Sequence, residues 1–593
     1  MIKQIVSASV GVAVWAAFAV EGVRPQAEFI GSVEFAAFSD FQKKIVDVGT
    51  TINNPAVPML AVPAVQNMLT EQFGKFRQDA PMKILCYADV AALRKALLAD
   101  AGASAEDALE AAFLYPCAEG AEAFLVNHPE AKKNAEGVIE LENGFVVQFA
   151  ADGRTCAFAT SAGAAKRALS AVPAAAAARP LVRMDFTESA IGLLADLHQK
   201  LAAEQANLLQ AGGTNAAERL APSFLKFQQA QMRRQNAILR KFAQMTLSMD
   251  LDATGFVVKG SVAAKPGAPA SPAAGFQLPA GALDAVPAGS PLFFAVNPVI
   301  SSNVQNDQDY RALLGEVRDL IDGLFACLRQ EKPDYAQTVD GLHAAMTDLL
   351  TAMPCPAPSD WGMCAFAFGP QQEPYLLQVG ESASAAQGAA AEARFYAAVA
   401  ETVGKKWPGI LRANGATLSV DWARLIDVVA AAFGATPEEQ GEVNRAKKTL
   451  AAIMGGPASE ISTVLPSQTS YRTFAGAKGF TPPAAAPSGE RRFAAAVPEA
   501  AANRPGCLFY LSLYSLLREN VLPLALKVVP QQKTAPIRSV VSVLPPAGAN
   551  SAIAGASWYE KDGSCSFLLR VTKAEIRNFG AAVNAAMAAQ MAE

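Results

Sequence analysis

Histidine is the side chain most often used for proton transfer near neutral pH and for binding metal ions. This chain has three, His128, His198 and His343. His128 lies between Asn127 and Pro129, a sequence typical of a turn. His198 and His343 lie in helical patterns, and neither has a second histidine one turn away, the spacing of a helical metal site. The sequence therefore has few candidate bases for a Ser-His-Asp triad, and we predict no metal site and no cofactor.

Short catalytic motifs give no stronger signal. The chain lacks the glycine-rich phosphate loops and the Gly-x-Ser-x-Gly elbow of hydrolases. Ser223 and Lys226 have the Ser-x-x-Lys spacing of penicillin-interacting enzymes, but no Ser-Asp-Asn or Lys-Thr-Gly lies nearby. Glu140 and Glu142 alternate along a strand and so share one side, where we expect solvent. We predict no catalytic residue from these patterns.

The cysteines number eight, and none forms Cys-x-x-Cys, so neither a thioredoxin-type redox site nor a zinc ribbon is indicated. An even number of cysteines in an exported chain permits disulfides, but the sequence does not determine their pairing. Several, including Cys86 and Cys156, lie in strand-like segments, where a buried thiol packs as a small apolar side chain.

One basic segment is unusual for this chain. Between Arg219 and Lys241 there is no acidic residue, and the next one is Asp250. Apolar residues recur at helical spacing through the same segment. If its cations share an exposed side, they form a surface for an anionic envelope component or an acidic protein. The alternative is a solvated helix face whose acids come from other segments. The residues of this possible anionic-partner surface are Arg219, Lys226, Arg233, Arg234, Arg240 and Lys241.

The elements that position these residues follow a recurring order. Segments 81–89, 180–187, 291–297, 417–421 and 505–512 each read as a strand, and most of them begin at a proline. Proline is tolerated at the first strand position, where no ladder donor is required. Asp, Asn or Ser then stands where it can cap a following helix.

Antiparallel hairpins close several of these modules. Residues 138–158 predict a meander with turns at Asn143-Gly144 and Asp152-Gly153, because these dipeptides supply the positive φ angles of tight hairpins. Residues 247–262 and 556–570 predict two further hairpins, the second followed by a helix over 573–591. The predicted class is therefore α+β, with repeated modules of strand, helix and antiparallel hairpin or meander and largely antiparallel sheets.

The N-terminus is the clearest functional signal. Lys3 precedes a charge-free apolar run from Ile5 to Val20, and Ala17 and Ala19 occupy the positions that signal peptidase reads. The run is short for a membrane-spanning helix, which needs roughly 20 residues. We predict a signal peptide over 1–19 and export to the periplasm or the outside of the cell. Retention as an anchor is the alternative.

Length and composition set the remaining limits. At 593 residues the chain is too long to fold around a single hydrophobic core. Its net charge of -4 gives no overall attraction to nucleic acid. We predict no nucleic-acid partner and no membrane span after signal cleavage. Proline-rich and alanine-rich stretches mark the boundaries. The predicted parts are the signal peptide 1–19, a first α+β domain 20–178, a second module 179–264 with the long basic helix, a linker 265–290, a third α+β domain 291–480, a linker 481–504 and a C-terminal α+β module 505–593.

This order of elements resembles exported bacterial proteins of unknown function that are built from repeated strand–helix–hairpin modules. The resemblance rests on the strand-to-helix segment 291–297 and on the block from 121–129 through 164–169. It covers about the first 300 residues and carries no catalytic motif. What it implies is export and the α+β fold, without an activity.

Three functions fit these observations. The leading hypothesis is an exported, non-catalytic protein with a binding role or a role as an envelope-assembly scaffold. The second is a periplasmic carrier of a hydrophobic ligand, because curved antiparallel sheets faced by helices can enclose apolar cavities. The third is a hydrolase with an unrecognised site. A large apolar cavity would favour the carrier, and a charged cleft with convergent titratable groups would favour the enzyme. A structure with neither would favour the scaffold.

Overall fold

The chain divides into two compact units in the computed structural model. Unit 1 comprises Met1–Ala203 and Met232–Ala268, and unit 2 comprises Glu204–Gln231 and Pro269–Glu593. The structure describes residues 27–98, 108–142, 144–171, 180–210, 216–270, 272, 274–302, 306–432, 440–480, 489–502, 505–529, 534–548 and 550–592. The predicted signal peptide, residues 1–19, lies outside the described residues.

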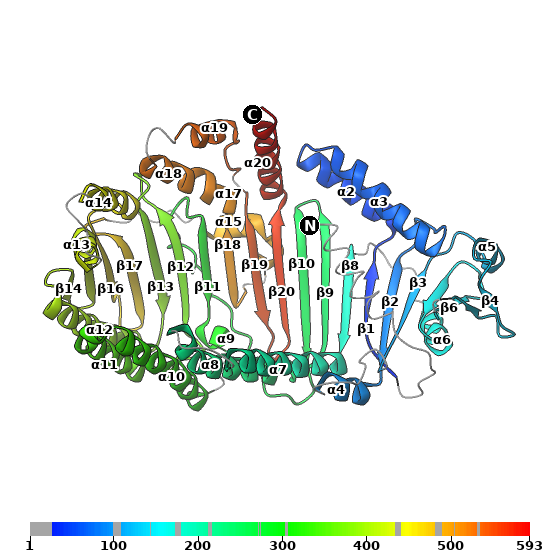
Figure 1. Cartoon of the computed structure of the whole chain (residues 1–593), viewed down its shortest axis with the longest axis horizontal. Coiled ribbons are helices and arrows are strands. Elements are labelled where there is room, and N and C mark those ends of the chain that lie inside the picture. The colour runs from blue at the N-terminus through cyan, green and yellow to red at the C-terminus, as the bar shows by residue number, and fades with distance from the viewer. Residues whose placement is uncertain are drawn as a thin grey trace. The chain divides into compact units, whose positions relative to one another are not determined.

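The elements from β1 to β10 build unit 1, apart from the part of α7 and α8 that belongs to unit 2 (Figure 1). They are β1 Glu28–Phe35, α2 Phe38–Thr51, α3 Ala56–Phe73, β2 Met82–Ala88, α4 Val90–Leu98, β3 Leu109–Tyr115, α5 Ala121–Asn127, β4 Lys132–Lys133, β5 Ile139–Glu140, β6 Val146–Phe149, β7 Cys156–Ala159, α6 Ala162–Ser170, β8 Val182–Thr187, α7 Glu188–Gln210, α8 Ala216–Leu239, β9 Phe242–Asp252 and β10 Gly255–Ala264.

The elements from β11 to α20 build unit 2. They are β11 Leu292–Val296, α9 Pro298–Ser302, α10 Asp307–Glu331, η2 Pro333–Tyr335, α11 Ala336–Ala352, β12 Trp361–Phe368, β13 Pro374–Glu381, α12 Ala385–Lys406, β14 Leu411–Asn414, β15 Thr417–Asp421, α13 Trp422–Ala432, α14 Gln440–Met454, β16 Ala458–Val464, β17 Ser470–Ala477, α15 Gly489–Ala496, α16 Pro498–Ala502, β18 Cys507–Leu511, α17 Leu513–Ser515, η3 Leu516–Val521, α18 Leu522–Val528, α19 Ala535–Val543, β19 Ile553–Tyr559, β20 Cys565–Thr572 and α20 Lys573–Ala592.

The two units repeat one strand order. In unit 1 the neighbours run β10-β9-β8-β1-β2-β3-β7-β6-β5-β4, and every pair is antiparallel. In unit 2 they run β20-β19-β18-β11-β12-β13-β17-β16-β15-β14, again all antiparallel. Adding ten to each strand number of unit 1 gives the order of unit 2. The predicted α+β class with largely antiparallel sheets is confirmed, and the chain also repeats at the level of the whole sheet.

Local sequence explains how the elements begin and turn. The Asp89 carboxylate accepts a hydrogen bond from the N–H of Ala92 (3.0 Å) at the start of α4. The Asn297 side chain accepts from Val299 (2.9 Å) and Ile300 (3.1 Å) at α9, so both residues cap helices as their positions predicted. The β19–β20 hairpin turns at Gly563 with a φ of 87°, a left-handed conformation that glycine adopts without strain.

One face of each sheet carries a packed core. In unit 1, α2 and α3 supply Phe38, Ile45 and Val62, which pack in the same cluster as Met82, Tyr115 and Phe158 of the strands. In unit 2, Phe293 and Tyr510 are buried side by side with ring centroids 4.7 Å apart. The Arg492 guanidinium of α15 lies 4.7 Å from the Tyr510 ring centre, a cation–π contact.

The two predicted linkers, 265–290 and 481–504, differ in the structure that they contain. The division between Ala268 and Pro269 falls inside the predicted linker 265–290. That segment contains no helix or strand in its described residues, yet Leu278, Leu283 and Val286 are buried. In the predicted linker 481–504, residues 489–502 form α15 and α16 with Phe493 buried, because an alanine-rich segment is also a good helix former.

Two predicted modules are integral parts of larger sheets. Strand β8, in the predicted module 179–264, pairs with β1 through Val33 and Met184. Strand β18, in the predicted module 505–593, pairs with β11 through Phe294 and Phe509. Each segment therefore completes a sheet that begins far earlier in the sequence.

Candidate functional site

The second face of the unit 2 sheet is lined by apolar side chains that are only partly covered. Successive strand residues point to opposite sides, and residues paired across a ladder point to the same side. The register therefore sorts side chains into a buried face with Phe293 and a second face with Phe294. We call this second face the open face; over β20, β19, β18, β11, β12 and β13 it comprises Cys565, Phe567, Leu569, Val571, Ile553, Gly555, Ser557, Tyr559, Cys507, Phe509, Leu511, Leu292, Phe294, Val296, Gly362, Cys364, Phe366, Phe368, Pro374, Leu376, Gln378 and Gly380.

Exposure distinguishes this face from a core. Phe294 is 42% exposed and Phe509, its ladder partner, is 37% exposed, whereas Phe293 on the other side of β11 is 0% exposed. Leu376 and Phe567 are also among the exposed large apolar residues. Large apolar side chains at the centre of a ten-stranded sheet are normally covered, so their exposure calls for a functional explanation.

Two glycines on the open face leave space that neighbouring aromatic side chains occupy. A Cβ added at Gly555 would come within 2.4 Å of a ring carbon of Phe509, so the ring occupies the space that a side chain would take. A Cβ at Gly380 would come within 2.6 Å of the Tyr471 hydroxyl oxygen.

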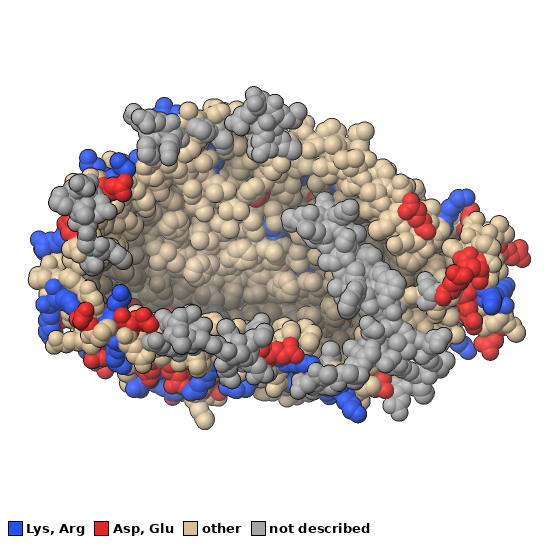
Figure 2. Space-filling model, viewed as in Figure 1, with Lys and Arg blue, Asp and Glu red and all other residues tan. Residues whose placement is uncertain are grey.

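No Lys, Arg, Asp or Glu belongs to the open face, although charged residues lie on the opposite face of the same sheet. On β17, β16 and β14, which continue the sheet beyond β13, the register places Arg472, Glu460 and Arg412 on the side opposite to the open face. Figure 2 shows the hollowed surface over β11, β12 and β13 without charged residues, while charged atoms gather on the surrounding helices. The sequence thus separates charge from apolar surface strand by strand.

Strands β8, β9 and β10 of unit 1 also have one uncharged face and one polar face. Met184, Leu247 and Val258 belong to a half-buried, uncharged strip along β8, β9 and β10. The strip consists of Val182, Met184, Phe186, Met245, Leu247, Met249, Leu251, Phe256, Val258, Gly260 and Val262. The strip shares its side of the sheet with Val33 and Phe35 of β1, so in unit 1 the uncharged side is the side on which α2 and α3 build the core.

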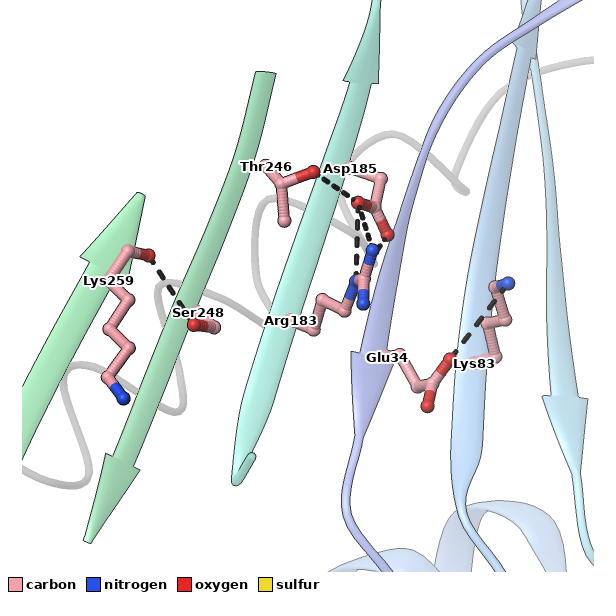
Figure 3. A network of polar contacts seen from close by, with 7 residues as sticks. All are labelled: Glu34, Lys83, Arg183, Asp185, Thr246, Ser248 and Lys259. Atoms are coloured by element: carbon pink, nitrogen blue, oxygen red, sulfur yellow. Dashed lines mark hydrogen bonds and ion pairs between the residues drawn. The ribbon is translucent and has the colours of Figure 1, made fainter. Parts of the chain in front are cut away.

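The opposite face of these unit 1 strands is polar (Figure 3). Arg183 and Asp185 form an ion pair at 3.0 Å, and the Thr246 hydroxyl donates to Asp185 at 2.7 Å. Burial acts to raise the pKa of Asp185, but the bonds from Arg183 and Thr246 and the nearby positive charges outweigh it, so the pKa is lowered. Lys83 and Glu34 continue the network with an ion pair at 4.0 Å.

The six cations of the predicted anionic-partner surface do not share one environment. Lys226 forms an ion pair with Asp319 of α10, and Arg240 pairs with Asp196, which also binds Arg94 at 2.7 Å. Arg233 is exposed, whereas Arg234 and Lys241 are half-buried, and the side chain of Arg219 lies outside the described residues. Acids from other segments therefore neutralise at least Lys226 and Arg240 among the described side chains, and an anionic partner stays a prediction.

The histidines have ordinary structural neighbours. His128 stacks on Phe124 with centroids 4.3 Å apart and lies 3.4 Å from Glu130. His343 lies between Asp322 at 2.6 Å and Arg329 at 2.9 Å. His198 is half-buried in α7. In the parts of the chain that the structure describes, no group of three or more His, Cys, Asp or Glu side chains is arranged to hold a metal ion.

The other residues singled out by motif do not converge. A Cβ on Gly323 of α10 would come within 2.2 Å of the Ser223 hydroxyl, so Ser223 lies at a tight helix contact. Glu140 and Glu142 are both exposed. All eight cysteines are thiols, and burial raises the pKa of Cys86 to about 11, which disfavours the reactive thiolate.

Comparison with known proteins adds no family. No family model, no curated protein and no solved structure matches this chain. Among the helices that the structure describes, none is long and apolar enough to cross a membrane.

Sequence reasoning had missed the open face, although the sequence carries a signal for it. Strands β11, β12 and β18 read LFFAV, WGMCAFAF and CLFYL, without a charged residue. In an antiparallel sheet with one solvated face, polar residues normally alternate with apolar ones. Strands that are apolar on both sides therefore predict a second apolar surface.

Proposed function

We propose that this chain is an exported carrier that holds the hydrocarbon part of a lipid on the open face of unit 2. The observation that carries the proposal is the uncharged surface around Phe294 and Phe509, which is partly exposed at the middle of the sheet. Within the wider hypothesis of a non-catalytic exported binding protein, this surface favours a carrier over a scaffold. Export itself rests on the sequence of residues 1–19.

The size of the face fits an acyl chain. Its six neighbouring strands have five spacings of about 4.8 Å, which gives a width of roughly 24 Å. The strands contain five to eight residues, which at about 3.3 Å per residue gives a length of roughly 17–26 Å. An acyl chain in one leaflet spans about 15 Å, half of a bilayer core. One extended chain therefore fits along the strands or across them.

The energetics favour hydrocarbon over a polar ligand. Each buried CH₂ group contributes about 0.8 kcal/mol to transfer from water, so a long acyl chain supplies ample binding energy. A face of about 500 Å² equals the largest apolar patches of ordinary monomers, and such patches are often functional. The proposal thus explains why this surface carries no charge.

Binding of a neutral naphthylamine dye, which fluoresces in apolar surroundings, tests the proposal. We expect saturable fluorescence enhancement by the signal-free protein and displacement of the dye by a long-chain lipid. A protein that takes up neither dye nor lipid, and that associates with itself through this face at rising concentration, would instead use the face as an interface between copies.

A further inference from the structure

A small group of polar side chains interrupts the apolar surface at one end of the open face. We call it the polar island; it comprises Gln378 of β13, Tyr471 and Thr473 of β17, Thr463 of β16 and Glu392 of α12. The register places Gln378 opposite Thr473, and Thr473 opposite Thr463, so these side chains share the side of the sheet that carries Leu376. The island is therefore continuous with the apolar surface.

The two threonine hydroxyls of the polar island donate their hydrogen bonds toward Glu392. The Thr463 hydroxyl donates to Oε2 of Glu392 at 2.9 Å, so the 2.9 Å bond between the two threonine hydroxyls is donated by Thr473. The chain of donors therefore ends on a carboxylate. Among the described residues, the Thr463 hydroxyl donates to Oε2 of Glu392 and none donates to Oε1. The Oε1 atom is therefore available to a hydrogen-bond donor of a ligand. Gln378 donates to the Tyr471 hydroxyl at 3.4 Å, a long bond that a better acceptor can replace.

The only formal charge in the polar island is negative. It contains one acid and no Lys or Arg, and Arg472, the next residue along β17, belongs to the opposite face because it pairs with Val379. A phosphate or carboxylate headgroup would find no counter-ion among the residues of the polar island and would meet the negative charge of Glu392. Removing an anion from water without a partner is costly, whereas a hydroxyl and an ester carbonyl need only hydrogen bonds.

We propose that the polar island selects an uncharged acylglycerol with a free hydroxyl, such as a diacylglycerol. The hydroxyl donates to Glu392, an ester carbonyl accepts from Gln378, and the acyl chains extend over Phe294 and Phe509. This proposal rests on the proposed carrier function and adds the class of lipid. A few placed polar groups in an apolar site commonly fix ligand orientation in this way.

Competition against the neutral dye tests the selection. The competitors are dioleoylglycerol, oleate and dioleoylphosphatidic acid, which share the same acyl chain. We expect wild-type protein to bind dioleoylglycerol at least about tenfold more tightly than either anion, a difference of about 1.4 kcal/mol. Equal affinity for oleate and dioleoylglycerol, with the dye still bound, would overturn the selection and leave the carrier proposal standing.

Variants locate the selection at the island. Glu392→Gln should raise the affinity for oleate and phosphatidic acid and narrow the tenfold preference, because it removes the repelling charge. Gln378→Leu should weaken dioleoylglycerol but not the dye. The matched control is Glu460→Gln, on the same strand as Thr463 but on the opposite face. It should change neither the lipid preference nor the affinity for the dye. An unchanged lipid ranking in Glu392→Gln would overturn the role of the island, and a wild-type protein that takes up no dye would overturn the carrier function itself.

Discussion

Phe294→Asp is expected to abolish dye and lipid binding while the protein stays folded. Phe294 lies at the centre of the open face, next to Phe509 and Cys364 in the ladders, so a carboxylate there would face the hydrocarbon of any bound ligand. An unpaired charge in contact with hydrocarbon costs far more than the contacts that the phenyl ring makes. The fold should survive because the Phe294 side chain is not part of the buried core.

The measurement is dye titration combined with thermal unfolding. Affinity should fall by more than about a hundredfold, or roughly 2.7 kcal/mol, with little change in the unfolding temperature. Val464→Asp is the matched control, because Val464 is another exposed apolar residue but pairs with Arg472 on the opposite face. Loss of binding in both variants, or in neither, would contradict the assignment of the site to the open face.

Glu499→Ala is expected to cause the largest loss of stability. Arg570 is 1% exposed, and both of its terminal nitrogens donate to the Glu499 carboxylate, at 2.7 and 2.8 Å. Removing the carboxylate takes an ion pair and two hydrogen bonds from a buried guanidinium, which costs about 3 kcal/mol. The free energy of unfolding of unit 2 should fall by that amount.

Tryptophan fluorescence during urea denaturation reports this loss. Apart from Trp15 in the predicted signal peptide, all the tryptophans, Trp361, Trp407, Trp422 and Trp558, belong to unit 2. The matched control is Glu490→Ala, at an exposed position in the first turn of α15, which should change the midpoint little. A shift in Glu499→Ala no larger than that of the control would show that the pair between Arg570 and Glu499 does not stabilise the unit.

Local elements were largely predictable from the sequence. The β9–β10 and β19–β20 hairpins, the meander of β5, β6 and β7 and the helix α20 all occur where their turn residues and apolar spacing place them. These features depend on contacts between neighbours in the chain. Turn chemistry and alternation are therefore sufficient to predict them.

Long-range pairing was not predictable in the same way. Nothing local in Met184 or Phe509 indicates that their strands lie beside β1 and β11. The repeat of ten strands is hidden because the connections differ: α7 and α8 join β8 to β9, whereas α17, η3, α18 and α19 join β18 to β19. A search for copies of a short segment misses a repeat whose insertions vary in length.

The basic helix shows why a charge pattern alone does not define a surface. Its sequence has no acid between Arg219 and Lys241, but Asp196 and Asp319 reach Arg240 and Lys226 from other helices. Ion pairs of this kind depend on tertiary packing. The open face is the reverse case, because its strands β11, β12 and β18 carry no charged residue on either side.

Lipid extraction from the protein purified without detergent from its native cell envelope tests the carrier function most directly. We expect organic solvent to release an acylglycerol from wild-type protein in an amount comparable to the protein, and little or none from Phe294→Asp prepared in parallel. Wild-type protein without bound lipid, which also fails to acquire lipid from vesicles that contain diacylglycerol, would contradict the carrier function.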